Sequence, residues 1–334
     1  MFIWLTEHAS ELDMIFHFLV LLSKDQNLAN ISASRWYHMN ERKAQMDLLG
    51  AGFLIGFNVL LGLNQALIKL VNAGFSPLFQ SGLRSLCAFP IVLLIAIAWR
   101  RRLSLSDGSL PWGILNGILF CSEFALLFIA LDYTTVARVS LFFYLMPVWV
   151  AAATHFLVPG EPLNRNKLGG LGLAVVGIAM ALSGDLGDAP EGAWIGDLLA
   201  LIGGMFWASI ALLTRLKLQY VSSEMNLLYQ LGVSAIVLTA AALFLGSPIR
   251  ELDLSIIMIF SFQVVVIVSV GYLLWFWVLS IYPVSNMTFF SLLAPIFGVF
   301  FGWAIFDDPI APVLAVSLLL SGVGIFLVNR PVQG

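Results

Sequence analysis

Charged side chains are scarce in this sequence. Lys, Arg, Asp and Glu make up 10% of its 334 residues, whereas they make up roughly a quarter of a typical soluble protein. Hydrophobic residues contribute 60%, and the mean hydropathy is +0.97. These values exclude an ordinary water-soluble domain and predict a chain that resides in a lipid bilayer.

Cysteine and histidine are also rare. The two cysteines, Cys87 and Cys121, both lie in apolar runs, which excludes a disulfide framework and a cysteine-rich metal site. The net charge of −3 offers no basic surface for nucleic acid. No phosphate-binding loop, Ser/His/Asp triad or zinc signature occurs. We therefore expect no cofactor, no metal, no nucleic-acid partner and no enzymatic activity.

Long apolar runs dominate the rest of the chain. About 20 consecutive apolar residues span a bilayer as a helix, and ten such runs follow one another with connections too short for an inserted soluble domain. The sequence thus predicts an all-α, multi-pass membrane protein with ten transmembrane helices. The expected spans cover residues 49–71, 76–99, 111–131, 137–158, 167–182, 194–214, 224–246, 254–279, 284–306 and 310–328.

Residues 1–46 differ in kind from the spans. They carry many charges, and their longest apolar run, residues 14–22, is about half the length that a span requires. We interpret this segment as a polar tail or an interfacial helix. The alternative is that translation begins at Met46, directly before the first span.

The distribution of basic residues predicts the orientation, because cytoplasmic loops retain Lys and Arg. With the N-terminus inside, only Arg138 and Arg250 lie at the outer side, and the acidic connection over residues 185–191 faces out. Both termini are then cytoplasmic. The basic residues at the inner side are Arg35, Arg42, Lys43, Arg100, Arg101, Arg102, Arg165, Lys167, Arg215, Lys217 and Arg330.

An internal repeat divides the spans into two halves. The segment around Pro147 matches the segment around Pro295, and Glu161-Pro162 after the first is answered by Asp308-Pro309 after the second. The halves cover residues 47–182 and 194–330. Because each holds five spans, the second must enter the membrane from the opposite side. Such inverted repeats are typical of transporters that work by alternating access.

The order of these motifs resembles the EamA branch of the drug/metabolite transporter superfamily. The resemblance covers residues from about 47 to 330 and implies ten helices arranged as two EamA repeats. It also implies a transporter of the plasma or bacterial inner membrane that exports small metabolites without ATP. The residues that carry it are Lys69, Arg84, Pro147, Gly160-Glu161-Pro162, Gly169-Gly170, Gly177, Gly196-Asp197, Trp207-Ala208, Pro295, Gly322 and Gly324.

Ionisable residues inside a membrane are costly and are therefore candidates for function. Glu123 and Arg84 each lie about eight residues from the outer end of their spans, which places both roughly 12 Å deep. Asn64 reaches the same layer. Lys69 is expected to extend to the surface instead, and Asp197 is expected only to complement the dipole at the start of its helix.

Two interpretations of Glu123 and Arg84 remain open. In the first, Glu123 is a coupling or recognition carboxylate: burial disfavours its charge and Arg84 favours it, so its proton occupancy can change with the access state. In the second, Glu123 and Arg84 form a fixed pair that holds two spans together. The second half has no equivalent charge pair, because Gly271 and Gln230 occupy the corresponding positions.

Prolines and aromatic residues complete the candidate site. Pro147 and Pro295 lie within spans, where each should kink its helix, and we consider both a gating role and a static bend. Aromatic side chains on spans that should line a central cavity can stack on flat or cationic substrates. These are Tyr144, Tyr229, Tyr272, Trp275 and Trp277.

Small residues mark close helix contacts. Gly298 and Gly302 form a GxxxG motif, and Ser317 with Ser321 forms a second small pair. Packing within a monomer is the preferred interpretation, with a homodimer as the alternative.

The sequence is compatible with three candidate functions. The first is a secondary transporter, either proton-coupled or facilitative, that exports small metabolites such as amino acids. The second is an efflux protein for hydrophobic organic cations or drugs. The third, a membrane enzyme or scaffold, is disfavoured by the inverted repeats.

Overall fold

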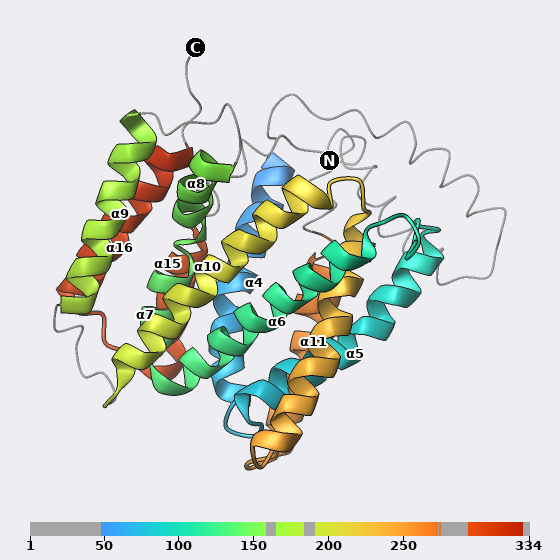
Figure 1. Ribbon diagram of the computed structural model, residues 1–334. Coiled ribbons are helices and arrows are strands. Elements are labelled where there is room, and N and C mark those ends of the chain that lie inside the picture. The colour runs from blue at the N-terminus through green and yellow to red at the C-terminus, as the bar shows by residue number, and fades with distance from the viewer. Residues whose placement is uncertain (1–47, 158–164, 184–190, 273, 275–292, 330–334) are drawn as a thin grey trace, which may run out of the picture.

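The computed structural model describes residues 48–157, 165–183, 191–272, 274 and 293–329. This part of the chain is helical and contains no strand beyond a single isolated bridge between Phe75 and Ile249. Figure 1 shows the helices side by side as one bundle. They are α4 (Leu48–Val71), α5 (Pro77–Ala98), α6 (Leu110–Tyr133), α7 (Val136–Phe143), α8 (Met146–Leu157), α9 (Arg165–Ser183), α10 (Ala193–Lys217), α11 (Ser223–Leu245), α12 (Leu254–Phe262), η1 (Gln263–Gly271), α15 (Leu293–Phe306) and α16 (Pro312–Asn329).

Seven helical segments in the described part are long and apolar enough to cross a membrane. Two of them are composite, because α7 with α8 makes one span and α12 with η1 makes another. The shorter apolar helices α15 and α16 correspond to the ninth and tenth predicted spans, and α9 to the fifth. The all-helical membrane class is therefore confirmed, while the full set of ten spans stays a prediction. The tail, residues 1–46, lies outside the described residues.

The fourth predicted span is interrupted where the sequence places Pro147. Helix α7 ends at Phe143 and α8 begins at Met146, so the expected single helix is in fact two. Proline has no N–H to donate, and its ring collides with the carbonyl four residues earlier, here that of Phe143. Pro295 is the third residue of α15, and the residues directly before that helix lie outside the described part.

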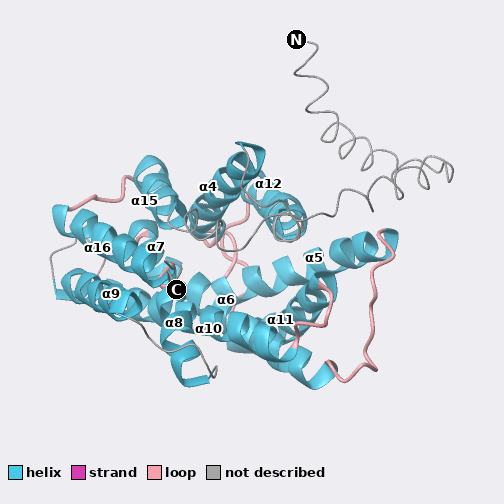
Figure 2. Cartoon of the chain, turned by 90° about the horizontal axis from the view of Figure 1, so that it is seen from above, coloured by secondary structure: helices cyan, strands magenta, loops and turns pink. Residues whose placement is uncertain are grey.

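The main helix contacts join the two halves of the sequence. Helix α5 packs along α11, α9 along α16, α6 along α10 and α4 along α15. Figures 1 and 2 show the pair α9–α16 at one edge of the bundle and α5–α11 at the opposite edge. Helix α7 lies between them and packs against α15 and α10.

Small residues permit the closest of these contacts. Gly298 of α15 lies against Ser140 of α7, and Gly302 lies against the backbone at Ala137. The second small pair behaves similarly, because Gly177 of α9 faces Ser317 and Ser321 of α16. Both motifs thus serve contacts within one chain.

Candidate functional site

Glu123 is a buried acid in the middle of α6. Only 4% of its surface is exposed, and among the described residues its carboxylate forms no ion pair within 4 Å. Burying a carboxylate is costly unless it is hydrogen-bonded or paired with a positive charge. Glu123 therefore occupies a position that packing alone does not favour.

Arg84 of α5 is the nearby positive charge. Arg84 is 3% exposed. Its guanidinium carbon lies 4.7 Å from the ring centre of Phe124 and 4.6 Å from that of Phe128. These cation–π contacts are favourable, but Nη1 of Arg84 has no hydrogen-bond partner in the described part of the chain. The arginine thus still has donors to offer.

Four of the predicted site residues come together. Arg84 and Glu123 lie close enough to interact electrostatically, although they form no ion pair within 4 Å. Tyr272, which directly follows η1, interacts with both charges, and Tyr144, at the break between α7 and α8, interacts with Tyr272. The cluster therefore combines two opposite charges with two phenols from four separate segments.

Helix α4 carries two buried amide side chains, each with an atom that lacks a hydrogen-bond partner among the described residues. Asn64 is 8% exposed and its Oδ1 has no partner among the described residues. The neighbouring Gln65 accepts a hydrogen bond from Ser140 of α7, while its Nε2 is unpaired there. Asn64 is thus buried with hydrogen-bonding capacity left over, as a ligand-binding amide would be.

The sequence did not predict a hydrogen-bonded pair of buried glutamines. Gln80 of α5 donates to Gln263, the first residue of η1, at 3.4 Å, and both side chains are fully buried. Oε1 of Gln80 and Nε2 of Gln263 are left without partners in the described residues. Gln80 lies one helical turn from Arg84 on the same face. Its partner begins a nine-residue π-helix, and π-helical turns occur frequently at functional sites.

Not all of the predicted aromatic residues join this cluster. The Tyr229 hydroxyl lies 2.9 Å from Ser109 Oγ, at the start of α6. Glu123 is 14 residues further along, which is about 20 Å in a helix. Tyr229 therefore lies apart from the Glu123 cluster. Trp275 and Trp277 lie outside the described residues.

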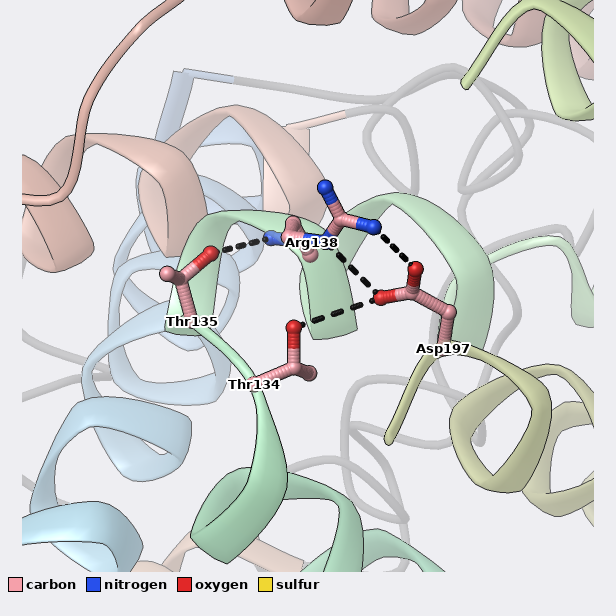
Figure 3. Close-up of polar contacts among 4 residues, drawn as sticks. All are labelled: Thr134, Thr135, Arg138 and Asp197. Atoms are coloured by element: carbon pink, nitrogen blue, oxygen red, sulfur yellow. Dashed lines mark hydrogen bonds and ion pairs between the residues drawn. The ribbon is translucent and has the colours of Figure 1, made fainter. Parts of the chain in front are cut away.

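A separate polar layer lies at the end of the bundle where α7 and α10 begin, which we name the outer end. Asp197 of α10 is fully buried and pairs with Arg138 of α7: the Arg138 Nε lies 3.0 Å from Oδ1, and Nη2 contacts Oδ2. The Thr134 hydroxyl donates to Oδ1 at 3.3 Å. Figure 3 shows the guanidinium and the carboxylate facing each other, with Thr134 beside them.

This layer corrects two expectations. Asp197 lies beyond the first turn of α10 and pairs with Arg138, so it is more than a helix-dipole partner. Lys69 does not extend freely to the surface: its Nζ donates to the Thr134 carbonyl at 2.7 Å and lies 5.4 Å from the ring centre of Phe306. Asp308 interacts electrostatically with Lys69 and accepts a hydrogen bond from Ala137 N at 3.3 Å.

An exposed ion pair lies at the same end. Arg250, in the connection before α12, donates two hydrogen bonds to Asp132 at 2.9 and 2.7 Å. The Asp132 carboxylate holds the pKa of Arg250 above its usual value. Both side chains are partly exposed to solvent, so this pair differs in burial from Arg138 and Asp197.

No cluster of three or more possible metal ligands occurs in the part of the chain that the structure describes. The arrangement offers instead buried charges, amides and phenols between apolar helices. Such a site can bind a small polar molecule or exchange a proton. These features define a polytopic membrane protein with a polar site inside its helical bundle.

Comparison with known proteins identifies the family. The EamA-like transporter family matches residues 48–183 and again residues 194–330. The chain therefore belongs to the EamA-like transporter family, and it is a transporter and not an enzyme. The resemblance seen in the sequence is confirmed.

Two curated relatives and one solved structure agree with this assignment. The uncharacterized transporter YoaV of Bacillus subtilis is 22% identical over 82% of this chain and 94% of its own length. The probable amino-acid metabolite efflux pump of Salmonella typhimurium is 24% identical over 72% of this chain and 81% of its own length. A crystal structure at 18% identity matches 82% of this chain and 94% of the solved chain with a TM-score of 0.59, which supports the fold.

Proposed function

We propose that this chain is a secondary transporter that exports small zwitterionic metabolites, such as amino acids, by alternating access. Glu123 binds the positively charged group of the substrate and Arg84 binds its carboxylate. Asn64 supplies hydrogen bonds, and Tyr144 and Tyr272 form the aromatic part of the site. The efflux name of the Salmonella relative supports the direction and the substrate class.

One observation carries this proposal. Arg84 and Glu123 interact electrostatically in a buried layer, yet they form no ion pair within 4 Å, and Nη1 of Arg84 has no hydrogen-bond partner among the described residues. A pair kept only for stability should satisfy its hydrogen bonds, because an unsatisfied buried charge is destabilising. A buried pair of opposite charges that are not bonded to each other matches a ligand that carries both charges.

The same geometry supports proton coupling. When no substrate is bound, a proton on Glu123 removes the cost of a buried negative charge. When the site opens to water or a cationic group enters, the ionised form is favoured. Glu123 can thus exchange its proton for a substrate during the transport cycle.

A second candidate is the efflux of hydrophobic organic cations. The guanidinium of Arg84 already lies over the rings of Phe124 and Phe128, so Glu123 remains as the partner for an external cation. The aromatic rings of Tyr144 and Tyr272 would add cation–π contacts.

The membrane arrangement is part of the proposal. Each half of the chain matches the family separately, and the helices that correspond between the halves, α5 with α11 and α9 with α16, pack on each other. Both facts support inverted repeats around a pseudo-twofold axis. We propose a monomer in the bacterial inner membrane with both termini in the cytoplasm.

The test measures the thermal stability of purified protein with added ligands. An amino-acid exporter should be stabilised by leucine or threonine, and a cation exporter by tetraphenylphosphonium. The Glu123→Gln variant should lose the stabilisation in either case, while Arg84→Met should lose it for amino acids only. Stabilisation of the wild type by neither class would contradict both candidates.

A further inference from the structure

Helix α7 is a short segment held at both ends. It has eight residues, all of them buried. Its inner end is the break before Pro147, where Tyr144 joins the Glu123 cluster. Its outer end is bound by two carboxylates of the second half, Asp197 from α10 and Asp308 from the segment after α15. Helix α7 therefore lies between the outer end and the candidate site.

The contacts at the outer end of α7 join the two halves of the chain. Arg138 and Thr134 belong to the first half and Asp197 to the second, and their contacts span 59 and 63 positions in sequence. At the opposite end of the bundle, α11 joins the halves in two ways. Glu224 forms an ion pair with Arg101 of the connection after α5, and Asn226 accepts a hydrogen bond from Asn116 of α6. A movement of α7 away from α10 must therefore break the Arg138–Asp197 pair.

A buried ion pair is suited to reversible opening. In the closed state, the attraction between the two charges is offset by the free energy needed to remove both from water. Apolar residues of similar volume would therefore hold two helices together at least as well. When water enters, however, both charges regain hydration and the lost contact is partly replaced. An apolar contact gains nothing from water. The chemistry thus favours a contact that opens over one that is permanent.

We propose that Arg138 and Asp197 are positioning residues of the transport cycle, which close the outer end by holding α7 against α10 and separate when the site opens to that side. The break before Pro147 lets α7 move while α8 stays packed on α16. Thr134 orients the Asp197 carboxylate, and Asp308 fixes the start of α7. The inference rests on the transporter function, and not on the assignment of Glu123 and Arg84 as substrate ligands.

The experiment measures access to the central site from each side of the membrane. Cys87 and Cys121 are replaced by alanine, and Tyr272→Cys supplies a single thiol beside Glu123. The rate of its reaction with a membrane-impermeant thiosulfonate is measured in intact cells and in inside-out vesicles. Because no substrate is needed, the result does not depend on which molecule is transported.

The Asp197→Asn variant should label several-fold faster than its parent from the outer side and more slowly from the inner side. The charge-exchanged variant, Arg138→Asp with Asp197→Arg, should return both rates toward the parent. Asp132→Asn is the matched control, because it removes a partly exposed ion pair at the same end. Exposed pairs contribute little, so its labelling should equal that of the parent.

Thr134→Val provides an independent variant, because it removes one hydrogen bond of Asp197 and leaves both charges in place. It should increase outer labelling by less than Asp197→Asn does. Unchanged labelling from both sides in Thr134→Val and Asp197→Asn would overturn the proposal, as would an equal increase in Asp132→Asn. Failure of Asp197→Asn to fold leaves Thr134→Val to decide.

Discussion

The guanidinium of Arg84 and the carboxylate of Glu123 lie near each other in the interior of the bundle without forming an ion pair. Arg84 contacts aromatic rings instead. The two interpretations drawn from the sequence, a functional site and a fixed pair, therefore make different predictions about mutants.

Glu123→Gln should fold and lose function. If the pair were structural, removing one partner would cost about 3–5 kcal/mol. In the functional interpretation Arg84 can bind water or substrate once Glu123 is neutral, so we expect a smaller loss of stability than this, together with loss of most transport or of its pH dependence. Melting temperature and efflux rate are measured for Glu123→Gln, Arg84→Met and the double variant. A double variant that regains full, pH-responsive transport would show that the charges serve only the fold.

Pro147→Ala should slow transport without abolishing binding. Alanine can donate the backbone hydrogen bond that proline cannot, so α7 and α8 should approach one continuous helix. A stiffer joint that raises the barrier by about 1.4 kcal/mol slows the cycle roughly tenfold. The efflux rate is compared with equilibrium ligand binding, which should change by less than the rate. Pro90→Ala is the control, because α5 continues through Pro90; equal effects of the two changes would contradict a gating role.

Glu123 and Arg84 could be found in the sequence because a charge within a long apolar run is conspicuous. The pairing of Arg138 with Asp197 could not, since each lies near the end of a span, where a charge is usually solvated. Only the packing of α7 on α10 buries both. Gln80 and Gln263 are uncharged and 183 positions apart, so their pairing depends on the tertiary fold.

The positions of the helices could be predicted from the sequence, but the π-helical segment could not. Hydropathy locates the spans because the bilayer requires apolar length, and Pro147 marks a break through its missing N–H. The π-helical segment η1 has no such mark, because Gln263–Gly271 contains no proline and reads as an ordinary apolar run. In the structure this segment follows α12 directly and packs against α5.

The predicted membrane orientation, with both termini in the cytoplasm, places the start of α10 outside and its end inside. Glu191, just before α10, and Lys217, its last residue, lie at opposite ends of one helix, and both are exposed. In a background with Cys87 and Cys121 replaced, Glu191→Cys should react with an impermeant thiol reagent in intact cells, and Lys217→Cys should react only in inside-out vesicles. The reverse pattern would invert the topology.

Substitution of Gly298 tests whether the GxxxG motif packs within the chain. A Cβ at this position would overlap the Ser140 hydroxyl of α7, and overpacking of this kind costs about 1–3 kcal/mol. Gly298→Ala should therefore lower the melting temperature of the purified protein. Gly322→Ala on α16 is the matched control, because no atom lies within 4 Å of its added Cβ, and its melting temperature should not fall. If the motif joined two copies instead, Gly298→Ala would convert dimers into monomers, as measured by light scattering, and leave the monomer as stable as before.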